Sequence, residues 1–263
     1  MKKGGGGTPT VRAVFLGDLV SRRIIPDGIY EGRELEALAH WVFPRLDQPA
    51  TALDIGANIG NHTCYLAEYF DRVVAFEPNP AVAAVLRANV MGRKSKIEVV
   101  EAGLSDRSGR LNFSVNETNL GASRVTAEPS EMTIKVDTLD QLAGPLRLDN
   151  IRFIKMDVEQ HEEQVLAGAA ALLASQRPVL AMEGHYKSYP EIGNRVVNQL
   201  NKLGYRHYYT FAPPRHSLFD RQYGGLRYVV PKLLRPLDRL TLSSINSIVG
   251  RDHNLVIAAA EFL

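Results

Sequence analysis

The segment from Leu53 to Asn61 (LDIGANIGN) constrains the fold of this chain more than any other feature. An apolar strand, a turn with glycine at positions 56 and 60, and the start of a helix follow one another directly. Glycine permits the backbone conformations that such a turn needs and lets backbone N–H groups approach a ligand closely. The segment therefore predicts a strand–turn–helix unit with a binding site at the carboxyl end of the strand.

Short apolar patterns alternate with longer helical patterns from Thr51 onward, which is typical of βα units around a parallel sheet. The predicted strands are Thr51–Ile55, Val73–Phe76, Ile97–Val100, Ile151–Met156, Pro178–Met182 and Asn254–Ala258. The predicted helices are Asn61–Tyr69, Ala81–Val90, Glu162–Leu173 and Ile192–Leu203. Together they predict a Rossmann-like, doubly wound α/β domain with helices on both faces of a mostly parallel sheet.

The chain outside this alternation divides into segments of different character. Residues 1–10 hold two lysines and four consecutive glycines and are interpreted as a flexible tail. Residues 11–50 are expected to form an N-terminal lid or edge element, and residues 51–263 the Rossmann-like domain. Within it, Leu111–Val115 and Thr133–Val136 predict short strands of an insertion over the sheet edge, and residues 206–250 a second insertion without a clean period.

Composition narrows the class of protein. With 263 residues, 45% hydrophobic and 23% charged, the chain has the balance of a globular domain. Its single cysteine, Cys64, excludes an internal disulfide and is expected in the core, which favours a cytoplasmic protein. No run of about 18 apolar residues is present, so no ordinary membrane-spanning helix is expected. The net charge of +2 gives no indication of nucleic-acid binding.

Two acidic residues flank the glycine turn. Asp54 precedes it, where a carboxylate repels a pyrophosphate and favours a ligand with an ammonium or sulfonium group. Glu77 ends the second strand, where an acid can accept hydrogen bonds from both ribose hydroxyls. Each acid alone would suit a helix or loop cap, but the two together indicate a nucleoside ligand. The G-x-G-x-x-G pattern of dinucleotide sites is missing from this turn, which disfavours an NAD-dependent oxidoreductase.

The loop after the third strand is a second candidate contact. Leu104 is placed to pack on an adenine face, and Ser105 or Asp106 to meet its amino group. The same residues also suit a simple turn from Ser105 to Gly109, and the sequence leaves both interpretations open.

The fourth strand ends in the block KMDVEQH, which clusters Asp157, Glu159 and His161 at the same sheet edge. Methyl transfer to an alcohol needs alignment and a base, which any of these three residues would supply. Glu159 also suits a helix N-terminus as a favourable charge. His185, after the fifth strand, is a further candidate base, and His62 either contacts a ligand or packs. No metal site is predicted, because three ligands within five residues at a strand end rarely point inward together.

With these residues in place, the chain resembles the FkbM-type methyltransferases of the class I Rossmann-like superfamily. The blocks that carry the resemblance are DIGANIGNHTCYLA from 54, AFEPNP from 75, AGLSDRSG from 102 and KMDVEQHEEQVLAG from 155. The resemblance covers residues 50–183 firmly and the last strand loosely.

The resemblance implies a seven-stranded sheet, S-adenosylmethionine as methyl donor, and O-methylation of a hydroxyl on a sugar, polyketide or related natural product. It assigns Glu77 to the ribose and the acidic patch from Asp157 to Glu159 to the side of the methyl group. The cofactor loop that it implies holds Asp54, Gly56, Asn58, Gly60 and Asn61. Gln160 departs from the glycine that many family members have, so the turn after Glu159 is expected to differ in shape.

The sequence thus predicts an O-methyltransferase whose acceptor is a hydroxylated small molecule or a carrier-linked one. Seven basic residues against two acidic ones between Arg206 and Arg239 favour an acidic acceptor, and equally suit a solvated face or a homodimer contact. The alternatives are a non-catalytic module that binds S-adenosylmethionine and, less favoured, an NAD-dependent oxidoreductase.

Overall fold

The computed structural model describes residues 14–15, 18–93, 96–116, 118–184, 186–212, 240–246, 248 and 255–263. The strands of its main sheet are β1 (Thr51–Ile55), β2 (Arg72–Phe76), β3 (Ile97–Val100), β8 (Ile151–Met156), β9 (Val179–Met182), β10 (His207–Ala212), β11 (Thr241–Ile245) and β12 (Val256–Ala259). The five predicted strands between residues 51 and 182 are confirmed with bounds that agree within one residue.

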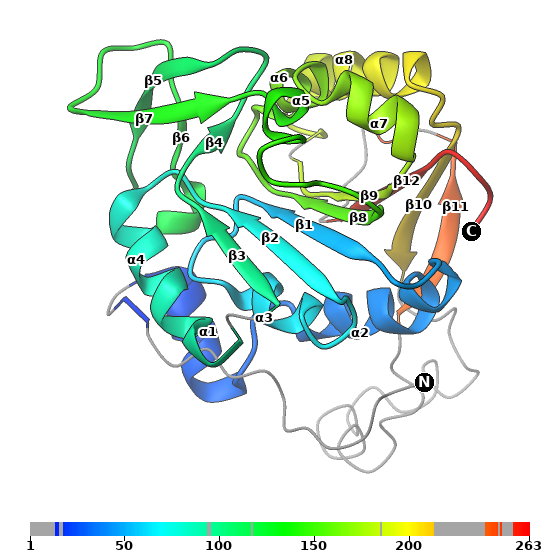
Figure 1. Cartoon of the computed structure of the whole chain (residues 1–263), viewed down its shortest axis with the longest axis horizontal. Helices are drawn as coiled ribbons and strands as arrows, with labels where there is room; N and C mark the ends of the chain where they lie inside the picture. The colour runs from blue at the N-terminus through cyan, green and yellow to red at the C-terminus, as the bar shows by residue number, and fades with distance from the viewer. Residues whose placement is uncertain are drawn as a thin grey trace, which may run out of the picture.

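The eight strands lie in the order β11-β10-β12-β9-β8-β1-β2-β3 (Figure 1). The pairs between β3 and β9 are parallel, whereas β12, β10 and β11 add to β9 through antiparallel pairs. The Rossmann-like architecture is confirmed, but the expected count of seven strands is wrong and the sheet is mixed. The sequence analysis did not predict β10 and β11. The edge strand β11 is only partly buried, and its residues do not alternate cleanly between apolar and polar.

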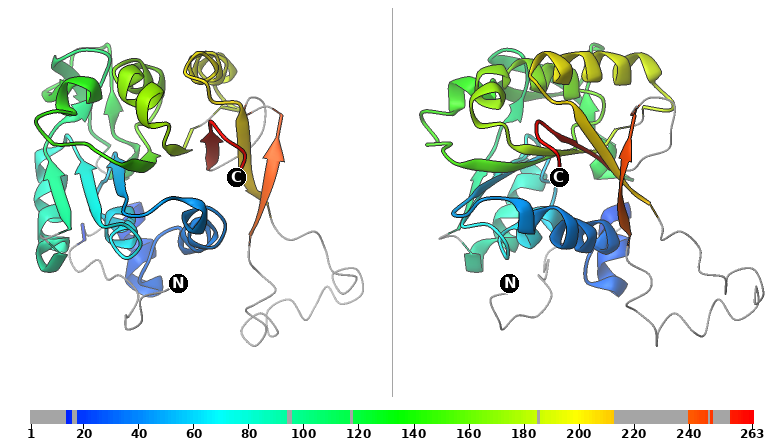
Figure 2. Two further views of the ribbon diagram at one scale, coloured as in Figure 1. Left: turned by 45° about the vertical axis from the view of Figure 1, so that its right-hand side comes forward. Right: turned by 90° about the vertical axis from the view of Figure 1, so that its right-hand side faces the viewer.

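Helices cover both faces of this sheet. They are α1 (Leu19–Asp27), α2 (Gly32–Trp41), α3 (Asn61–Leu66), α4 (Pro80–Asn89), α5 (Leu139–Leu142), α6 (Glu162–Ala167), α7 (Ala170–Gln176) and α8 (Pro190–Lys202), with short 3-10 helices at Phe43–Arg45, Met91–Arg93 and Leu120–Ala122. Figure 2 shows the blue helices α1 and α2 on one side of the sheet and the yellow helix α8 on the other. In the described part of the chain, no helix has the length and apolar character needed to span a membrane.

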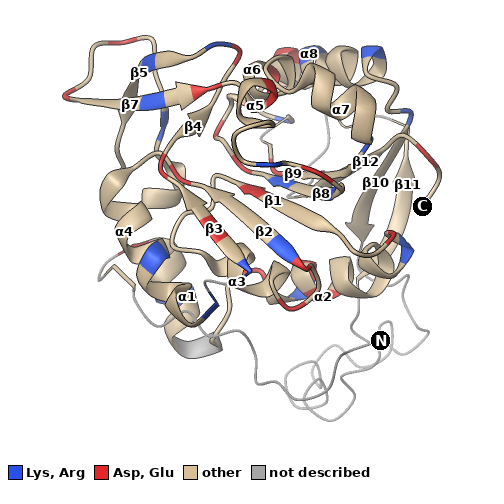
Figure 3. Cartoon of the chain, in the orientation of Figure 1, with Lys and Arg blue, Asp and Glu red and all other residues tan. Residues whose placement is uncertain are grey.

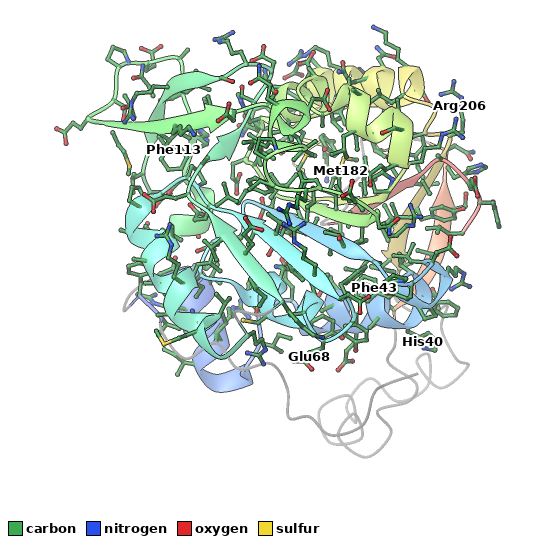
Figure 4. The ribbon with its side chains drawn as sticks, in the orientation of Figure 1. His40, Phe43, Glu68, Phe113, Met182 and Arg206 are labelled. Carbon is green, nitrogen blue, oxygen red and sulfur yellow. The ribbon has the colours of Figure 1, made fainter. Side chains whose placement is uncertain are left out.

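Alternating strand residues fill the two layers between sheet and helices. Leu53 and Ile55 pack with α6, α7 and α8 in one apolar cluster, whereas Ala52 packs with α2, α3 and α4 in the other. Phe43, labelled in Figure 4, lies with its ring centroid 5.1 Å from those of Phe70 and Phe153. Because both faces are buried, the central strands are largely apolar and do not alternate between apolar and polar residues.

The N-terminal region contributes to this packing. Leu35 and Leu38 of α2 are fully buried in the same cluster as Phe43. The Nε1 atom of Trp41 donates a hydrogen bond of 2.8 Å to the carbonyl of Leu240, just before β11. Helix α2 is therefore part of the core, while α1 packs through Val20 on the turn after β1. The division into a lid at 11–50 and a domain at 51–263 stays a prediction.

A second sheet lies beside the carboxyl end of β3. Its strands β4 (Gly103–Leu104), β5 (Gly109–Ser114), β6 (Arg124–Val125) and β7 (Met132–Asp137) are arranged in the order β4-β7-β5-β6. The two strands predicted around residues 111 and 133 are thus confirmed as β5 and β7. They belong to a separate small sheet, whose Phe113, Ile134 and Val136 form an apolar cluster.

The predicted helix Glu162–Leu173 is broken into α6 and α7. Gly168 lies at the break, so close to the loop after β4 that a Cβ atom there would sit 1.9 Å from the carbonyl oxygen of Ser105. The carboxylate of Asp140 accepts hydrogen bonds from the backbone N–H groups of Ala171 and Leu172, both 2.9 Å long, and so starts α7. The break is a tertiary contact that helical periodicity does not report.

This contact predicts that Gly168→Ala destabilises the fold by roughly 2 kcal/mol or more, because the added methyl group overlaps backbone. Gly144→Ala is the matched control, since a Cβ there meets nothing within 4 Å. Urea denaturation followed by circular dichroism measures both free energies of unfolding. Equal stabilities of the two variants would contradict the proposed crowding at Gly168.

Candidate functional site

The turn after β1 lies directly against the end of β8. Gly56 has a left-handed φ of 79°, and a Cβ atom there would sit 1.8 Å from the carbonyl oxygen of Asp157. The N–H groups of Gly56 and Ala57 both donate to the carbonyl of Phe76, at 3.0 Å. Gly60 also has positive φ, and α3 begins after it. Only glycine at position 56 permits this approach of three strand ends.

Glu77 is held at the end of β2 by the same turn. Its Oε2 atom accepts a hydrogen bond from the N–H of Asn58 and its Oε1 atom one from the N–H of Asn79, each 2.9 Å long. Burial raises the pKa of this carboxyl to about 7, against the lowering effect of the two backbone bonds. A carboxylate has about four acceptor positions, so about two remain for a ligand.

A cavity separates the carboxyl ends of β1 and β2 from the second sheet, and Glu77 lines it. Its apolar residues come from both sheets: Ile55, Phe76, Leu104, Phe113, Leu120, Val125, Ile134 and Val136. Phe113 is labelled in Figure 4 on the side of the second sheet. A flat apolar ring and a group that donates hydrogen bonds to a carboxylate fit such a cavity.

His161 lines this cavity. It does not line the larger cleft that opens beside the cavity. Its Nε2 atom lies 3.0 Å from the hydroxyl of Ser105, which in turn donates to Asp106 over 3.1 Å. Burial lowers the pKa of His161, which favours the neutral ring. The structure thus brings the predicted contacts Leu104 and Ser105 together with His161, whose role as a base stays a prediction.

Asp54 is fully buried, and neither the cavity nor the neighbouring cleft is lined by it. Its Oδ2 atom accepts a hydrogen bond of 2.5 Å from the hydroxyl of Thr63 in α3, and its Oδ1 atom has no hydrogen-bond partner among the described residues. The geometry therefore fits Asp54 better as a group that fixes α3 beneath the turn than as a direct contact.

Among the described residues that line the cavity or the cleft beside it, Lys155 carries the only ammonium group. It is 3% exposed, and its Nζ atom lies 3.2 Å from Asp157 Oδ2 and 3.4 Å from Glu183 Oε1. Burial by itself lowers the pKa of Lys155, but the two carboxylates raise it above its ordinary value. Charged residues thus occur within the central strands β1 and β8 (Figure 3), where a parallel sheet is usually apolar.

A larger cleft of about 610 Å³ opens beside the cavity and shares Gly56, Asn58 and Asp157 with it. Glu159 also lines this cleft, and its place beside the methyl group stays a prediction. Glu159 and Gln160 both adopt left-handed backbone, with φ of 48° and 74°. The turn at Glu159 and Gln160 is therefore strained, because neither residue is a glycine. The backbone N–H of Gln160 donates a hydrogen bond of 3.1 Å to Glu162 Oε1.

Three further residues of the cleft were not predicted as a group: Glu31, His62 and Glu183. Asn61 positions the segment that carries Glu31. Its side chain forms two hydrogen bonds with the backbone of the preceding residue, Tyr30, at 2.9 and 3.0 Å. The predicted cofactor residue Asn61 thus joins the segment before α2 to the start of α3. These three residues are far apart in the sequence, so only the tertiary structure shows that they form a group.

Three sequence predictions lie wholly or mostly outside the described residues: the flexible tail at residues 1–10, His185, and the basic segment, since residues 213–239 are not described. The acidic acceptor and the homodimer contact inferred from that segment stay predictions.

A glycine turn after β1 and a held acid after β2, at the carboxyl edge of a doubly wound sheet, define the class of Rossmann-like α/β domains that bind nucleoside cofactors. A family model described as the methyltransferase FkbM domain matches residues 54–207, which is more than half of the chain. The chain belongs to the FkbM methyltransferase domain family.

Two relatives share part of the sequence. Hexuronic acid methyltransferase AglP of Haloferax volcanii is 32% identical over 122 residues, which are 46% of this chain and 51% of AglP. The 2-O-methyltransferase NoeI of Sinorhizobium fredii is 29% identical over 145 residues, which are 48% of this chain and 59% of NoeI. The matches thus span about half the length of these relatives.

The crystal structure of methyltransferase FkbM from Methylobacillus flagellatus matches the fold. It has a TM-score of 0.51 and 18% sequence identity, and the match covers 84% of this chain and 47% of that chain. At this identity the similarity concerns the fold alone.

The buried lysine yields a prediction for stability. Lys155→Met leaves two largely buried carboxylates without their cation and is expected to cost roughly 3 kcal/mol. Arg195→Met is the control, because its pair with Glu163 is half exposed and worth less than about 1 kcal/mol. Chemical denaturation at neutral pH measures both, and a loss below that of the control would contradict the role given to Lys155.

Proposed function

We propose that the chain is an S-adenosylmethionine-dependent O-methyltransferase that acts on a hydroxyl of a saccharide or related acceptor. The observation that carries this proposal is the carboxylate of Glu77, held by two backbone N–H groups in the wall of a largely apolar cavity beside the glycine turn. Membership of the FkbM methyltransferase domain family supports the reaction class. The names of AglP, a hexuronic acid methyltransferase, and NoeI, a 2-O-methyltransferase, support a sugar hydroxyl as acceptor.

The residues present fit the nucleoside part of this cofactor. Glu77 keeps acceptor positions for ribose hydroxyls, and Leu104 and Phe113 offer an apolar surface to adenine. Gly56 and Asn58 line both the cavity and the cleft, so they would lie beside the centre of the bound molecule. When bound, S-adenosylmethionine supplies a methyl group on a positively charged sulfur.

The acceptor is assigned to the cleft beyond Asp157. Asp157 lines both spaces and therefore lies between the two ligands. Its carboxylate, fixed by Lys155, orients an acceptor hydroxyl or accepts its proton, and Glu159 at the same wall is the second candidate for the proton. The role of Lys155 is to hold the carboxylate of Asp157 in place through their ion pair.

The first test is isothermal titration of the purified chain with S-adenosylmethionine and, separately, with NAD. Binding of S-adenosylmethionine alone is expected. Mass spectrometry of a panel of uronic acid and neutral glycosides, incubated with the protein and cofactor, then detects a gain of one methyl group. Binding of NAD without S-adenosylmethionine would overturn the proposal, and binding without methylation of any acceptor would favour a non-catalytic module.

Glu77 gives a pH-dependent prediction. Its carboxyl, with a pKa of about 7, accepts ribose hydrogen bonds best when ionised, so affinity for S-adenosylhomocysteine is expected to fall as the pH drops below 7. Glu77→Gln should weaken binding at pH 8 by about 10-fold, the loss of a hydrogen bond to a charged group, and should flatten this pH dependence. Glu68→Gln, at a 44% exposed side chain, is the control. Unchanged affinity in Glu77→Gln would rule out ribose binding by this residue.

Asp157 is predicted to affect turnover rather than cofactor binding. Asp157→Asn keeps the shape of the side chain but removes its charge, so kcat should fall while the affinity for S-adenosylhomocysteine stays within a few-fold of the wild type. Steady-state kinetics on an accepted glycoside and calorimetry separate the two effects. Equal losses in both measurements would contradict the assigned division.

A further inference from the structure

Three side chains from distant parts of the sequence converge on one wall of the acceptor cleft. Glu31 precedes α2, His62 lies in the first turn of α3, and Glu183 follows β9. One donor atom from each lies within 4.8 Å of the other two. The Nε2 atom of His62 is 3.4 Å from Glu31 Oε2. All three side chains are partly buried, so they meet inside the cleft rather than on an open surface.

We propose that Glu31, His62 and Glu183 bind one divalent transition-metal ion. Imidazole and carboxylate ligands lie about 2.1 Å from such an ion, so their donor atoms lie about 3 to 4 Å from one another. The observed separations exceed this by less than about 2 Å, a distance that side-chain rotation alone can close. Three protein ligands leave further coordination positions open toward the cleft.

The charges around the cluster favour a cation. Glu183 and Asp157 share the single ammonium of Lys155. Glu183 Oε1 is shielded from solvent and has no hydrogen-bond partner among the described residues. Its polar contact is the ion pair with Lys155 Nζ at 3.4 Å. Glu31 faces His62, whose ring is neutral when it acts as a metal ligand. Among the described residues, ion pairs join Glu183 and Asp157 to Lys155, and Glu31 to His62, so a divalent ion at the cluster would place further positive charge beside these carboxyl groups.

The donor set indicates the class of metal. Carboxylate oxygens suit Mg²⁺, Ca²⁺ and Mn²⁺, and an imidazole suits Fe²⁺ and Zn²⁺, so the mixed set of two carboxylates and one imidazole fits a transition metal such as Mn²⁺, Fe²⁺ or Zn²⁺. The sequence predicted no metal site, because it considered only neighbouring ligands around Asp157, and that set differs from the present one. The new site joins residues separated by 31 and 121 positions along the chain.

The inferred role of the ion rests on the proposed function. A metal in the acceptor cleft binds a hydroxyl oxygen of the saccharide at an open position and lowers the pKa of that hydroxyl. Two neighbouring hydroxyls of a sugar would chelate it and fix which of them faces Asp157. The cluster thus orients the acceptor, whereas Glu77 and its cavity hold the cofactor.

The test is Mn²⁺ binding to the full chain after treatment with a chelator, followed by electron paramagnetic resonance and calorimetry. One Mn²⁺ per chain is expected, with weaker binding of Mg²⁺. Neither cofactor nor acceptor is needed, so this result is independent of whether the protein methylates a sugar. An absence of Mn²⁺ binding would overturn the metal site and leave the proposed function standing.

Variants assign the ion to the cluster. His62→Gln and Glu31→Gln should each weaken Mn²⁺ binding at least about 10-fold. Even the loss of a residue that only supports a metal ligand typically lowers metal affinity by about that factor. Glu183→Gln is a third variant, interpreted only if its thermal unfolding matches that of the wild type. Glu68→Gln, at an exposed side chain in the turn after α3, should bind Mn²⁺ like the wild type. Equal affinity in His62→Gln, Glu31→Gln and wild type would place the ion elsewhere and overturn the proposal.

Discussion

The approach of the β1 turn to the end of β8 is the constraint on which the rest of the site depends. Gly56 lies where any side chain would overlap the carbonyl of Asp157, so the two strand ends meet without a layer of side chains between them. This contact brings the N–H of Asn58 to Glu77 and sets Asp157 between the cavity and the cleft. A bulkier residue at position 56 would separate groups that have to act on one ligand.

Charge is the second organising element. The central strands are buried on both faces, yet β1 carries Asp54 and β8 carries Lys155 at their carboxyl ends. Burial of an ion is tolerated only where a partner compensates it, and Lys155 meets Asp157 and Glu183 for that reason. The site is therefore a cluster of opposite charges inside an apolar sheet, and among the described residues that line the cleft the acidic groups outnumber the basic ones. Such an arrangement suits cationic ligands better than anionic ones.

Much of this arrangement follows from local patterns. Strands β1, β2, β3, β8 and β9 are short and largely apolar with clear ends, and their bounds agree with the prediction within one residue. The break between α6 and α7 was not predictable, because Gly168 and Asp140 act through contacts across the fold. The prediction also missed β10 and β11. In the case of β11, the strand lies at the edge of the sheet, is only partly buried, and shows little periodicity in its residues.

The sequence by itself determined the Rossmann-like class, the glycine turn, and the residues Glu77, Leu104, Ser105 and Asp157 that gather at the sheet edge. These features depend on short-range spacing, because the carboxyl ends of neighbouring parallel strands always meet at one edge. Only the tertiary structure decided that Asp54 faces Thr63, that His161 faces Ser105, and that Glu31, His62 and Glu183 share one wall. Those pairings depend on how helices and loops pack over the sheet, and no local pattern in the sequence records a contact between segments so far apart.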